Sequence, residues 1–317
     1  MTATTKPRLC RTPSQTTPLA RIPEALRGIW RSCRGDGDDD VEVARSLAIN
    51  FVGVAAADDE AELRAAVDRL HRRTPCRAFL LLVDEHADAV HAEVAAATRL
   101  APGRQDILVE EIVLRLPADR FDHVPGLVRP LLVNDLPIHL FWAADWPRTE
   151  PAFDDLAALC DHVIVDTRRF ASPAVQLAHL TRRREAGMRL TDLTWLRLRP
   201  WRRALAEAYE RASQAVGRPT RVRIVHGTAA LAAAMLLGEW LTARLTAEVA
   251  LEGSGDGDAA CPERVVVTAG DTEIDAEAPA GQIVVHVTTA AHCLLPFRVP
   301  TSRGADGDLV AAAIDLG

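Results

Sequence analysis

The first half of this chain alternates short apolar runs of strand length with stretches that have helical periodicity. The runs are LAINFVGV (47–54), AFLLLV (78–83), ILVEEIVLRL (107–116), PIHLFWA (137–143) and HVIVD (162–166). A continuous apolar run of this length is typical of a strand that is buried on both faces of a parallel sheet. Strands that alternate with helices predict a doubly wound, Rossmann-like α/β domain over residues 41–168.

The stretches between these runs predict the helices of that domain. The first helix should follow Asp59, which can cap it together with Glu62 three residues on. Its buried face should consist of Leu63, Val67 and Leu70. Further helices are expected near residues 87–98, 119–129 and 152–160.

The second half of the chain predicts a different kind of domain. Helices are expected near 173–187, from Pro200 onward and over 228–245, and strands near 221–226, 246–252, 264–269 and 282–288. The last three strands are joined without long helices, and short connections favour antiparallel pairing. Residues 169–317 should therefore form a second α/β or α+β domain with an antiparallel portion. The helix over 228–245 should bury Leu231, Met235, Leu241 and Leu245.

Residues 1–40 have no strand periodicity and are rich in proline, so we expect a mobile N-terminal tail. One short helix near 23–33 is compatible with the pattern. The acidic run GDGDDD (35–40) has the composition of a calcium loop, but it lacks the glycine and glutamate that such a loop needs at its sixth and twelfth positions. A solvated linker is the simpler interpretation.

Composition excludes several classes of protein. The net charge of −7 over 317 residues gives no reason to expect nucleic acid or an anionic membrane as a partner. The longest apolar run, at 229–237, is too short to span a bilayer. The N-terminus has no apolar signal segment, and the six cysteines show no paired spacing. We therefore expect a cytoplasmic protein with reduced thiols.

A search for catalytic motifs finds none. The sequence has no G-x-G-x-x-G after a strand, no G-x-x-x-x-G-K-[ST], no G-x-S-x-G and no H-E-x-x-H. Lys6 is the only lysine, so a Schiff base in the folded part is excluded. The histidines and cysteines match no zinc spacing. The sequence therefore predicts no catalytic residue, no cofactor and no metal, and it makes an enzyme less favoured.

Arginine is concentrated between residues 168 and 203, with Trp195 and Trp201 interleaved. Arg and Trp are enriched in the energetic centres of protein interfaces. The same mixture could stack single-stranded nucleic acid or bind a phosphorylated metabolite. The plainest alternative is a solvated, arginine-rich helix face in a protein from a GC-rich genome. Asp166, at the end of a predicted strand, is either functional or an ordinary turn residue.

Three segments in order resemble the OpcA family, the assembly or effector proteins of glucose-6-phosphate dehydrogenase. They are PLLVNDLPIHLFWAADWP (130–147), DHVIVDTRRF (161–170) and DLTWLRLRPWRRAL (192–205). The resemblance covers roughly residues 41–250, and the sequence after about 250 matches poorly.

The resemblance implies a non-catalytic, two-domain α/β protein that binds the dehydrogenase and favours its active or oligomeric form. We expect no nucleic acid and no membrane as partners, and the chain's own oligomeric state stays open. The candidate contacts are Asp135, Trp142, Trp146, Asp166, Arg168, Trp195, Arg197, Trp201 and Arg202. The four tryptophans among them can equally be core residues.

Two alternatives remain. The first is an α/β protein, with or without enzymatic activity, that binds a sugar phosphate or nucleotide at Asp166 and Arg168. The second is a nucleic-acid binder that uses the arginine-rich segment, which the acidic net charge disfavours.

Overall fold

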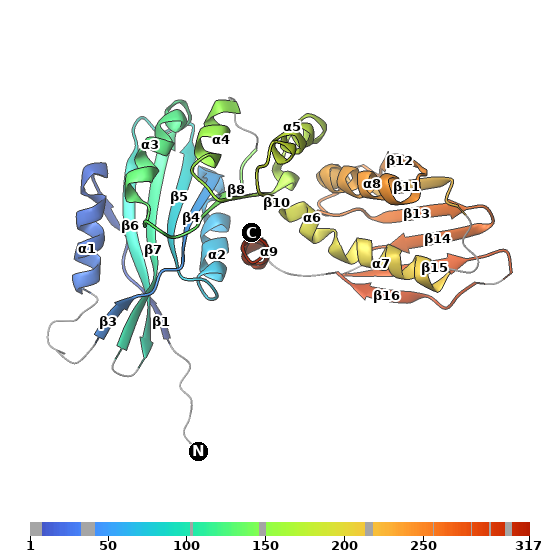
Figure 1. Cartoon of the computed structure of the whole chain (residues 1–317), viewed down its shortest axis with the longest axis horizontal. Coiled ribbons are helices and arrows are strands. Elements are labelled where there is room, and N and C mark those ends of the chain that lie inside the picture. Colours follow the sequence, from blue (N-terminus) through green and yellow to red (C-terminus); the bar gives the residue numbers. More distant parts are fainter. Residues whose placement is uncertain are drawn as a thin grey trace, which may run out of the picture. The chain divides into compact units, whose positions relative to one another are not determined.

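The computed structural model describes residues 8–32, 42–101, 104–145, 150–212, 218–255, 257–279, 281–291, 293–301 and 306–317. It is an α/β structure with two sheets (Figure 1). The chain divides into two compact units. Unit 1 comprises Met1–Val165, Met188–Thr191 and Asp306–Gly317, and unit 2 comprises Asp166–Gly187 and Asp192–Ala305.

The sheet of unit 1 has ten strands in the described residues. Eight lie in the order β1 (Arg8–Arg11), β6 (His91–Ala101), β7 (Arg104–Pro117), β5 (Cys76–Asp84), β4 (Ile49–Ala56), β8 (Ile138–Trp142), β9 (His162–Val165) and β10 (Leu190–Asp192). The short strands β2 (Gln15–Thr17) and β3 (Glu42–Arg45) pair with β6 and β7. Strands β7, β5, β4, β8 and β9 run parallel, which confirms the predicted parallel core.

Helical segments cover both faces of this sheet. On one face, α2 (Glu60–Leu70) packs so closely that a Cβ at Gly53 would lie 2.7 Å from Leu63 Cδ1. On the other face, the Trp142 ring meets the edges of Phe121 and Phe153, with centroids 5.6 and 5.2 Å away. These phenylalanines belong to the 3₁₀ segment Ala118–His123, which continues into α3 (Val124–Val128), and to α4 (Glu150–Ala157). The doubly wound fold is therefore confirmed.

The helix expected near residues 87–98 is wrong, because this segment forms the strand β6. Its alanines favour a helix in isolation. In the fold, however, β6 lies between β7 and the N-terminal strands and pairs antiparallel with both. Residues 94–98 are buried, so backbone pairing and packing outweigh the local propensity.

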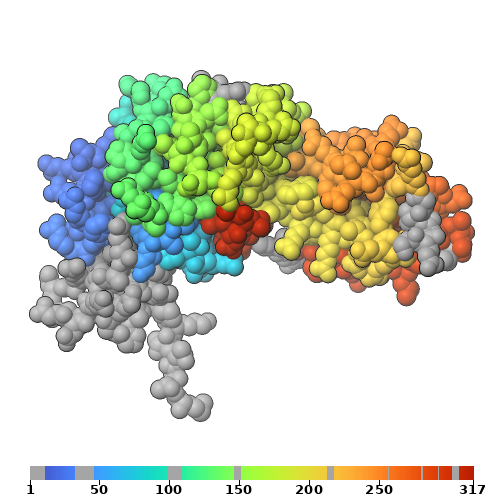
Figure 2. Space-filling view, viewed as in Figure 1, coloured from blue at the N-terminus to red at the C-terminus, as the bar shows by residue number. Residues whose placement is uncertain are grey.

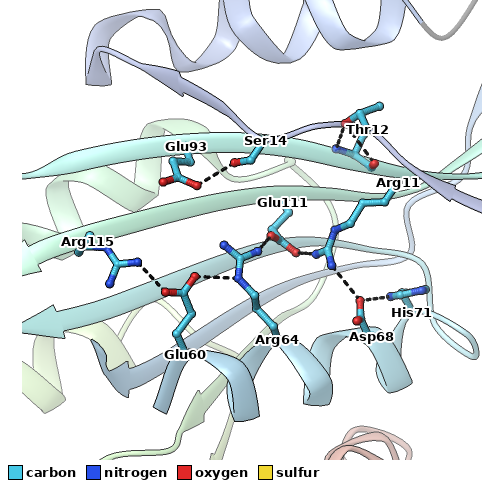
Figure 3. Close-up of polar contacts among 11 residues, drawn as sticks. Arg11, Thr12, Ser14, Glu60, Arg64, Asp68, His71, Glu93, Glu111 and Arg115 are labelled. Carbon is cyan, nitrogen blue, oxygen red and sulfur yellow. Dashed lines mark hydrogen bonds and ion pairs between the residues drawn. The ribbon is translucent and has the colours of Figure 1, made fainter. Parts of the chain in front are cut away.

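Part of the segment expected to be a tail is built into unit 1. Strands β1 and β2 extend the sheet, and α1 (Ile22–Ser32) packs Ile22, Leu26 and Ile29 into the core. Figure 3 shows the polar contacts that hold the first strand: Arg11 forms ion pairs with Glu111 and with Asp68. Glu111 is buried at the centre of β7, so it requires a cationic partner. The remainder of the 1–40 segment, including GDGDDD, lies outside the described residues.

The sheet of unit 2 has six strands in the described part of the chain. Their order is β12 (Glu248–Gly253), β11 (Arg221–His226), β13 (Arg264–Ala269), β14 (Thr272–Glu277), β15 (Gln282–Thr288) and β16 (Phe297–Pro300). Strands β11 and β12 are parallel and all other pairs are antiparallel, as expected for the second domain. The helices α7 (Arg199–Arg211) and α8 (Leu231–Leu245) pack on this sheet.

The buried face of α8 differs from the expected one. Leu241 is buried as predicted, but Leu231, Met235 and Leu245 are only half-buried. Small residues face the sheet instead, and a Cβ at Gly238 would lie 3.3 Å from Val249. The close approach of helix and strand selects alanine and glycine there, and a pattern of large apolar residues cannot reveal this.

The remaining helices are α5 (Pro173–Glu185), α6 (Leu193–Arg197) and α9 (Asp306–Ile314), with 3₁₀ turns at Leu19–Arg21, Ala57–Asp59, Arg129–Leu131, Thr167–Arg169 and Thr228–Ala230. Helix α9 returns to unit 1 and packs on α2, where the red C-terminal segment lies beside the cyan surface (Figure 2). None of the helices in the described ranges has the length and apolarity that a membrane crossing needs.

Candidate functional site

The segments 161–170 and 192–205 meet at Asp166, the first residue after β9. Arg197 binds its carboxylate with both arms of the guanidinium, Nη1 at 2.7 Å from Oδ1 and Nη2 at 2.8 Å from Oδ2. Arg168 donates its backbone amide to Oδ1 and its Nη2 to Oδ2, each at 3.2 Å. Asp166 is 1% exposed, so this is a desolvated, two-armed ion pair.

A second buried carboxylate, Asp192, lies beside Asp166. It caps α6 by accepting the backbone amide of Thr194 at 2.9 Å, and it accepts the Thr167 hydroxyl at 2.8 Å. Burial raises the pKa of Asp192 to about 6, and the nearby charge of Asp166 adds to this effect. The hydrogen bonds from Thr167 and Thr194 act in the opposite direction.

A carboxyl group with a raised pKa is a common sign of a catalytic site, but the surroundings of Asp192 indicate a structural role. Each oxygen of both carboxylates already accepts at least one hydrogen bond from residues 167–168 or 194–197. Both arms of Arg197 are bound to Asp166, so they are not available to an anionic ligand. The Asp166–Asp192 cluster therefore fixes the start of α6 and positions the residues beyond it.

These residues include a partly exposed aromatic and basic surface. The guanidinium of Arg202 stacks on the Trp195 ring, with Cζ 3.6 Å from the ring centroid, and its Nη2 donates to the Trp195 carbonyl at 3.2 Å. Burial and the neighbouring Arg199 lower the pKa of Arg202. Arg199 and Arg203 lie on the same helix, and both are exposed. We call these four residues the Trp195–Arg202 surface.

One atom of this surface lacks a partner. The Nε of Arg202 is buried and has no hydrogen-bond partner among the residues that the structure describes. A buried donor without a partner is energetically costly. This donor becomes available to an incoming acceptor only if the Arg202 side chain moves.

The structure separates the nine residues proposed as contacts. Trp142 and Trp201 are 2% and 1% exposed and are core residues, so they do not form a surface. Asp166 is likewise buried, and Arg197 is held against it. Asp135 is exposed in a turn with φ 62°, and Trp146 lies outside the described residues. The half-buried residues of the set are Arg168, Trp195 and Arg202, together with Arg197.

The segment 130–147 begins with a loop that unit 1 fixes through its backbone. The Asn50 amide donates to the carbonyls of Val133 and Leu136 at 2.9 and 3.2 Å, and Arg77 donates to the carbonyl of Leu131 at 2.5 Å. The Nε of Arg77 also donates to the buried Glu110 at 2.7 Å. These contacts place the exposed Asp135 at a fixed position in the loop.

Sequence reasoning missed Asn50, Arg77 and Glu110, although a signal was present. Asn50 and the pair Glu110–Glu111 interrupt apolar runs predicted to be buried on both faces. A polar group at such a position must find a partner within the protein. Asp192 offered a weaker signal, as an aspartate immediately before a helix.

No group of three or more histidine, cysteine, aspartate or glutamate side chains suited to a metal is present in the described ranges. His139 and His162 are buried neighbours whose Nδ1 atoms lie 3.3 Å apart, and burial lowers the pKa of His162 to about 4. His162 is held by the Thr191 hydroxyl at 2.9 Å, so the pair is part of the packing of unit 1.

Two domain descriptions of one family match the chain. The N-terminal domain described for the glucose-6-phosphate dehydrogenase subunit matches residues 67–182. The C-terminal domain described for the same protein matches residues 188–315. Together they cover most of the chain, including the segment after about residue 250, where the short-motif resemblance is poor.

Cyanobacterial relatives named OxPP cycle protein OpcA are similar to this chain. The Nostoc punctiforme protein is 33% identical over 183 residues, which is 56% of this chain and 39% of the relative. The Synechocystis protein is 31% identical over 187 residues, covering 56% of this chain and 38% of the relative. The matched region thus spans about two fifths of these relatives.

Among solved structures, a 3-ketoreductase from Actinomadura kijaniata has a similar backbone fold. It is 13% identical, the superposition covers 85% of this chain and 88% of that one, and the TM-score is 0.48. Nothing about the site follows from a likeness of this degree.

Proposed function

The chain belongs to the OpcA family of glucose-6-phosphate dehydrogenase subunits, and from this membership we propose that it is a non-catalytic subunit that binds its host's glucose-6-phosphate dehydrogenase. By binding, it favours the active or oligomeric form of the dehydrogenase in the oxidative pentose phosphate pathway, in the cytoplasm. The sequence lacks G-x-G-x-x-G, G-x-x-x-x-G-K-[ST], G-x-S-x-G and H-E-x-x-H motifs, which supports a role without chemistry of its own.

Such a role needs only differential binding. A subunit shifts an equilibrium between two forms of the dehydrogenase by as much as it prefers one form over the other. A tenfold shift corresponds to about 1.4 kcal/mol. One buried aromatic side chain at an interface can supply this amount.

The Trp195–Arg202 surface is the observation from which we assign the proposed binding to particular residues. It joins an aromatic ring, a stacked guanidinium and two further arginines on one short stretch. The Asp166–Asp192 cluster holds this stretch rigidly, which lowers the entropy lost on binding. Its chemistry fits an acidic, partly apolar patch on the dehydrogenase. Arg168 and Asp135 remain further candidate contacts.

The sugar-phosphate alternative is less well supported. The cationic groups nearest Asp166 belong to Arg168 and Arg197, and both are bound to the Asp166 carboxylate. A phosphate would have to displace a buried carboxylate from these partners, which is unfavourable.

The test mixes the purified chain with the host dehydrogenase and measures activity and complex size. We expect a larger complex and a changed rate or substrate affinity. Arg202→Glu should weaken the complex at least tenfold, because it reverses the charge at the centre of the surface. Arg244→Glu is the matched control, since Arg244 is exposed on α8 of the same unit.

Thermal unfolding of both variants shows whether the fold is intact. If wild-type chain leaves rate, affinity and mass of the dehydrogenase unchanged, the proposed function is refuted. If the complex forms but tolerates Arg202→Glu as well as Arg244→Glu, the function stands and the Trp195–Arg202 surface does not.

A further inference from the structure

The sheet of unit 2 has a second face, opposite the side on which α7 and α8 pack. Alternate residues of β11 illustrate this, because Val222 and Ile224 are buried while Arg221 is exposed and Arg223 half-exposed. The registers of the other strands show which of their residues lie on the same side of the sheet as Arg221 and Arg223. We call the side chains on this second side the outer face: Glu248, Ala250, Glu252, Arg221, Arg223, Val225, Arg264, Val266, Thr268, Glu273, Asp275, Glu277, Val284, His286, Thr288 and Arg298.

Charge on the outer face is arranged by strand. The edge strand β12 contributes two glutamates and β14 contributes three carboxylates, whereas β11 contributes two arginines. Arg264 of β13 and Arg298 of β16 are the remaining cations, and β15 carries no formal charge with His286 neutral. Four arginines against five carboxylates give this face a net charge of −1. A partner that is strongly charged throughout, such as nucleic acid, would gain nothing here.

Neighbouring strands already pair some of these charges. Arg264 holds Asp275 with Nε at 2.8 Å and Nη2 at 2.6 Å, and its Nε lies 3.3 Å from Glu277. Arg223 lies 3.5 Å from Glu252. The side chains of this last pair are 42% and 48% exposed, so both can still contact another surface.

The strand order makes one row of the outer face, the row that includes Glu252, complementary to itself. Consider a two-fold axis that runs along the strands, midway between β13 and β14. The axis places β13 of one copy over β14 of the other, β11 over β15 and β12 over β16. In the row of residues that includes Glu252, Arg264 then faces Glu277 of the second copy and Glu252 faces its Arg298. The two arginines of β11 face the uncharged strand β15.

Apolar contact follows from the same superposition. In the row of residues that includes Glu252, the register places Val225 on β11 and Val284 on β15. The axis sets these two half-buried valines against each other. The long Arg and Glu side chains of this row can follow the roughly 30° angle at which stacked sheets cross.

We propose that the outer face of the unit 2 sheet binds the same face of a second copy of this chain, forming an isologous dimer. Six strands about 4.8 Å apart, with side chains along roughly 15–20 Å of each, give a flat area of roughly 400–500 Å² per copy. The total for two copies, roughly 800–1,000 Å², lies in the range of weak, transient interfaces, so the dimer should dissociate with a Kd on the order of micromolar or weaker.

The test uses the full-length chain alone, without the dehydrogenase, so it is independent of the proposed function. Sedimentation of the wild type from about 1 to 100 μM, a range around that Kd, should show twice the chain mass at the upper end. Glu252→Arg and Arg298→Glu should each remain monomeric, with affinity at least tenfold weaker, because each creates two like-charge contacts in a symmetric dimer. The matched controls are Glu239→Arg and Arg244→Glu on the exposed side of α8.

Mixing the two interface variants gives the sharpest result. In a mixed dimer, the two reversed side chains face each other at one end with opposite charges, while the native Glu252 and Arg298 meet at the other end, so association should return. Misfolded variants could not restore each other in this way. If the wild type is monomeric at every concentration, the proposal is overturned. It is also overturned if the wild type dimerises and both charge-reversal variants dimerise with the same affinity. A monomer whose Arg298→Glu variant loses dehydrogenase binding also overturns it, and assigns the outer face to the dehydrogenase.

Discussion

Asp192 illustrates at the scale of one residue how burial changes a side chain's chemistry. Its folded pKa of about 6 lies above its ordinary value of 3.8. Between these values the folded state holds a proton that the unfolded state has released. Asp192 therefore lowers stability as pH rises through this window, and the loss is complete above about pH 6.

We predict that Asp192→Asn removes this pH dependence, because the asparagine oxygen can still cap α6 without ionising. The unfolding free energy of the wild type, minus that of the variant, should fall by about 2–3 kcal/mol between about pH 4 and pH 7. Chemical denaturation at several pH values measures it. Asp315→Asn, at an exposed carboxylate, should leave the corresponding difference flat. A constant difference for Asp192→Asn as well would contradict the assignment of the raised pKa.

At the scale of elements, α8 ends on a strained residue. Thr246 has φ 53° and ψ 35°, a left-handed conformation that glycine adopts without strain, while its amide closes the last turn on Thr242 at 3.2 Å. The sequence places a β-branched residue where the backbone favours glycine.

We predict that Thr246→Gly stabilises the protein by about 0.5–1 kcal/mol, the strain relieved less the added freedom of the unfolded chain. Ala243→Gly, three residues earlier in the helix, should instead destabilise by about 1 kcal/mol. Urea denaturation of both variants checks the opposite signs. Two variants of the same sign would show that the conformation at Thr246 carries no strain.

At the scale of the whole molecule, neither unit is a continuous stretch of chain. The four residues Met188–Thr191 and the segment Asp306–Gly317 belong to unit 1 although both are separated from the rest of it in sequence by parts of unit 2. Helix α9 buries Val310, Ala311 and Ala313, and Gly307 sits where a Cβ would lie 2.7 Å from the Arg69 Cβ.

We predict that a chain ending at Thr301 keeps unit 2 and destabilises unit 1 by about 3 kcal/mol or more, the apolar burial that α9 provides. Hydrogen exchange should accelerate in α2 and β9, which contact α9, and stay unchanged in β13, β14 and β15. Equal acceleration in both sheets, or in neither, would contradict this division of the chain.

The sequence alone determined the parallel core of unit 1, the antiparallel portion of unit 2, the absence of catalytic motifs and the family resemblance. The first two follow from local periodicity, because a run buried on both faces is apolar throughout while a half-buried strand alternates. The family resemblance rests on three short segments whose order can be read without knowing any contact.

Only the tertiary structure decided which of those residues are accessible. Trp142 and Trp201 are core residues while Trp195 is stacked at a surface, and the composition around them does not distinguish the two cases. Local sequence also fails to identify β6 as a strand. Its alanines favour a helix in isolation, but in the fold the segment pairs with β7. Burial and strand pairing depend on segments far apart in the chain, so no local window of sequence contains them.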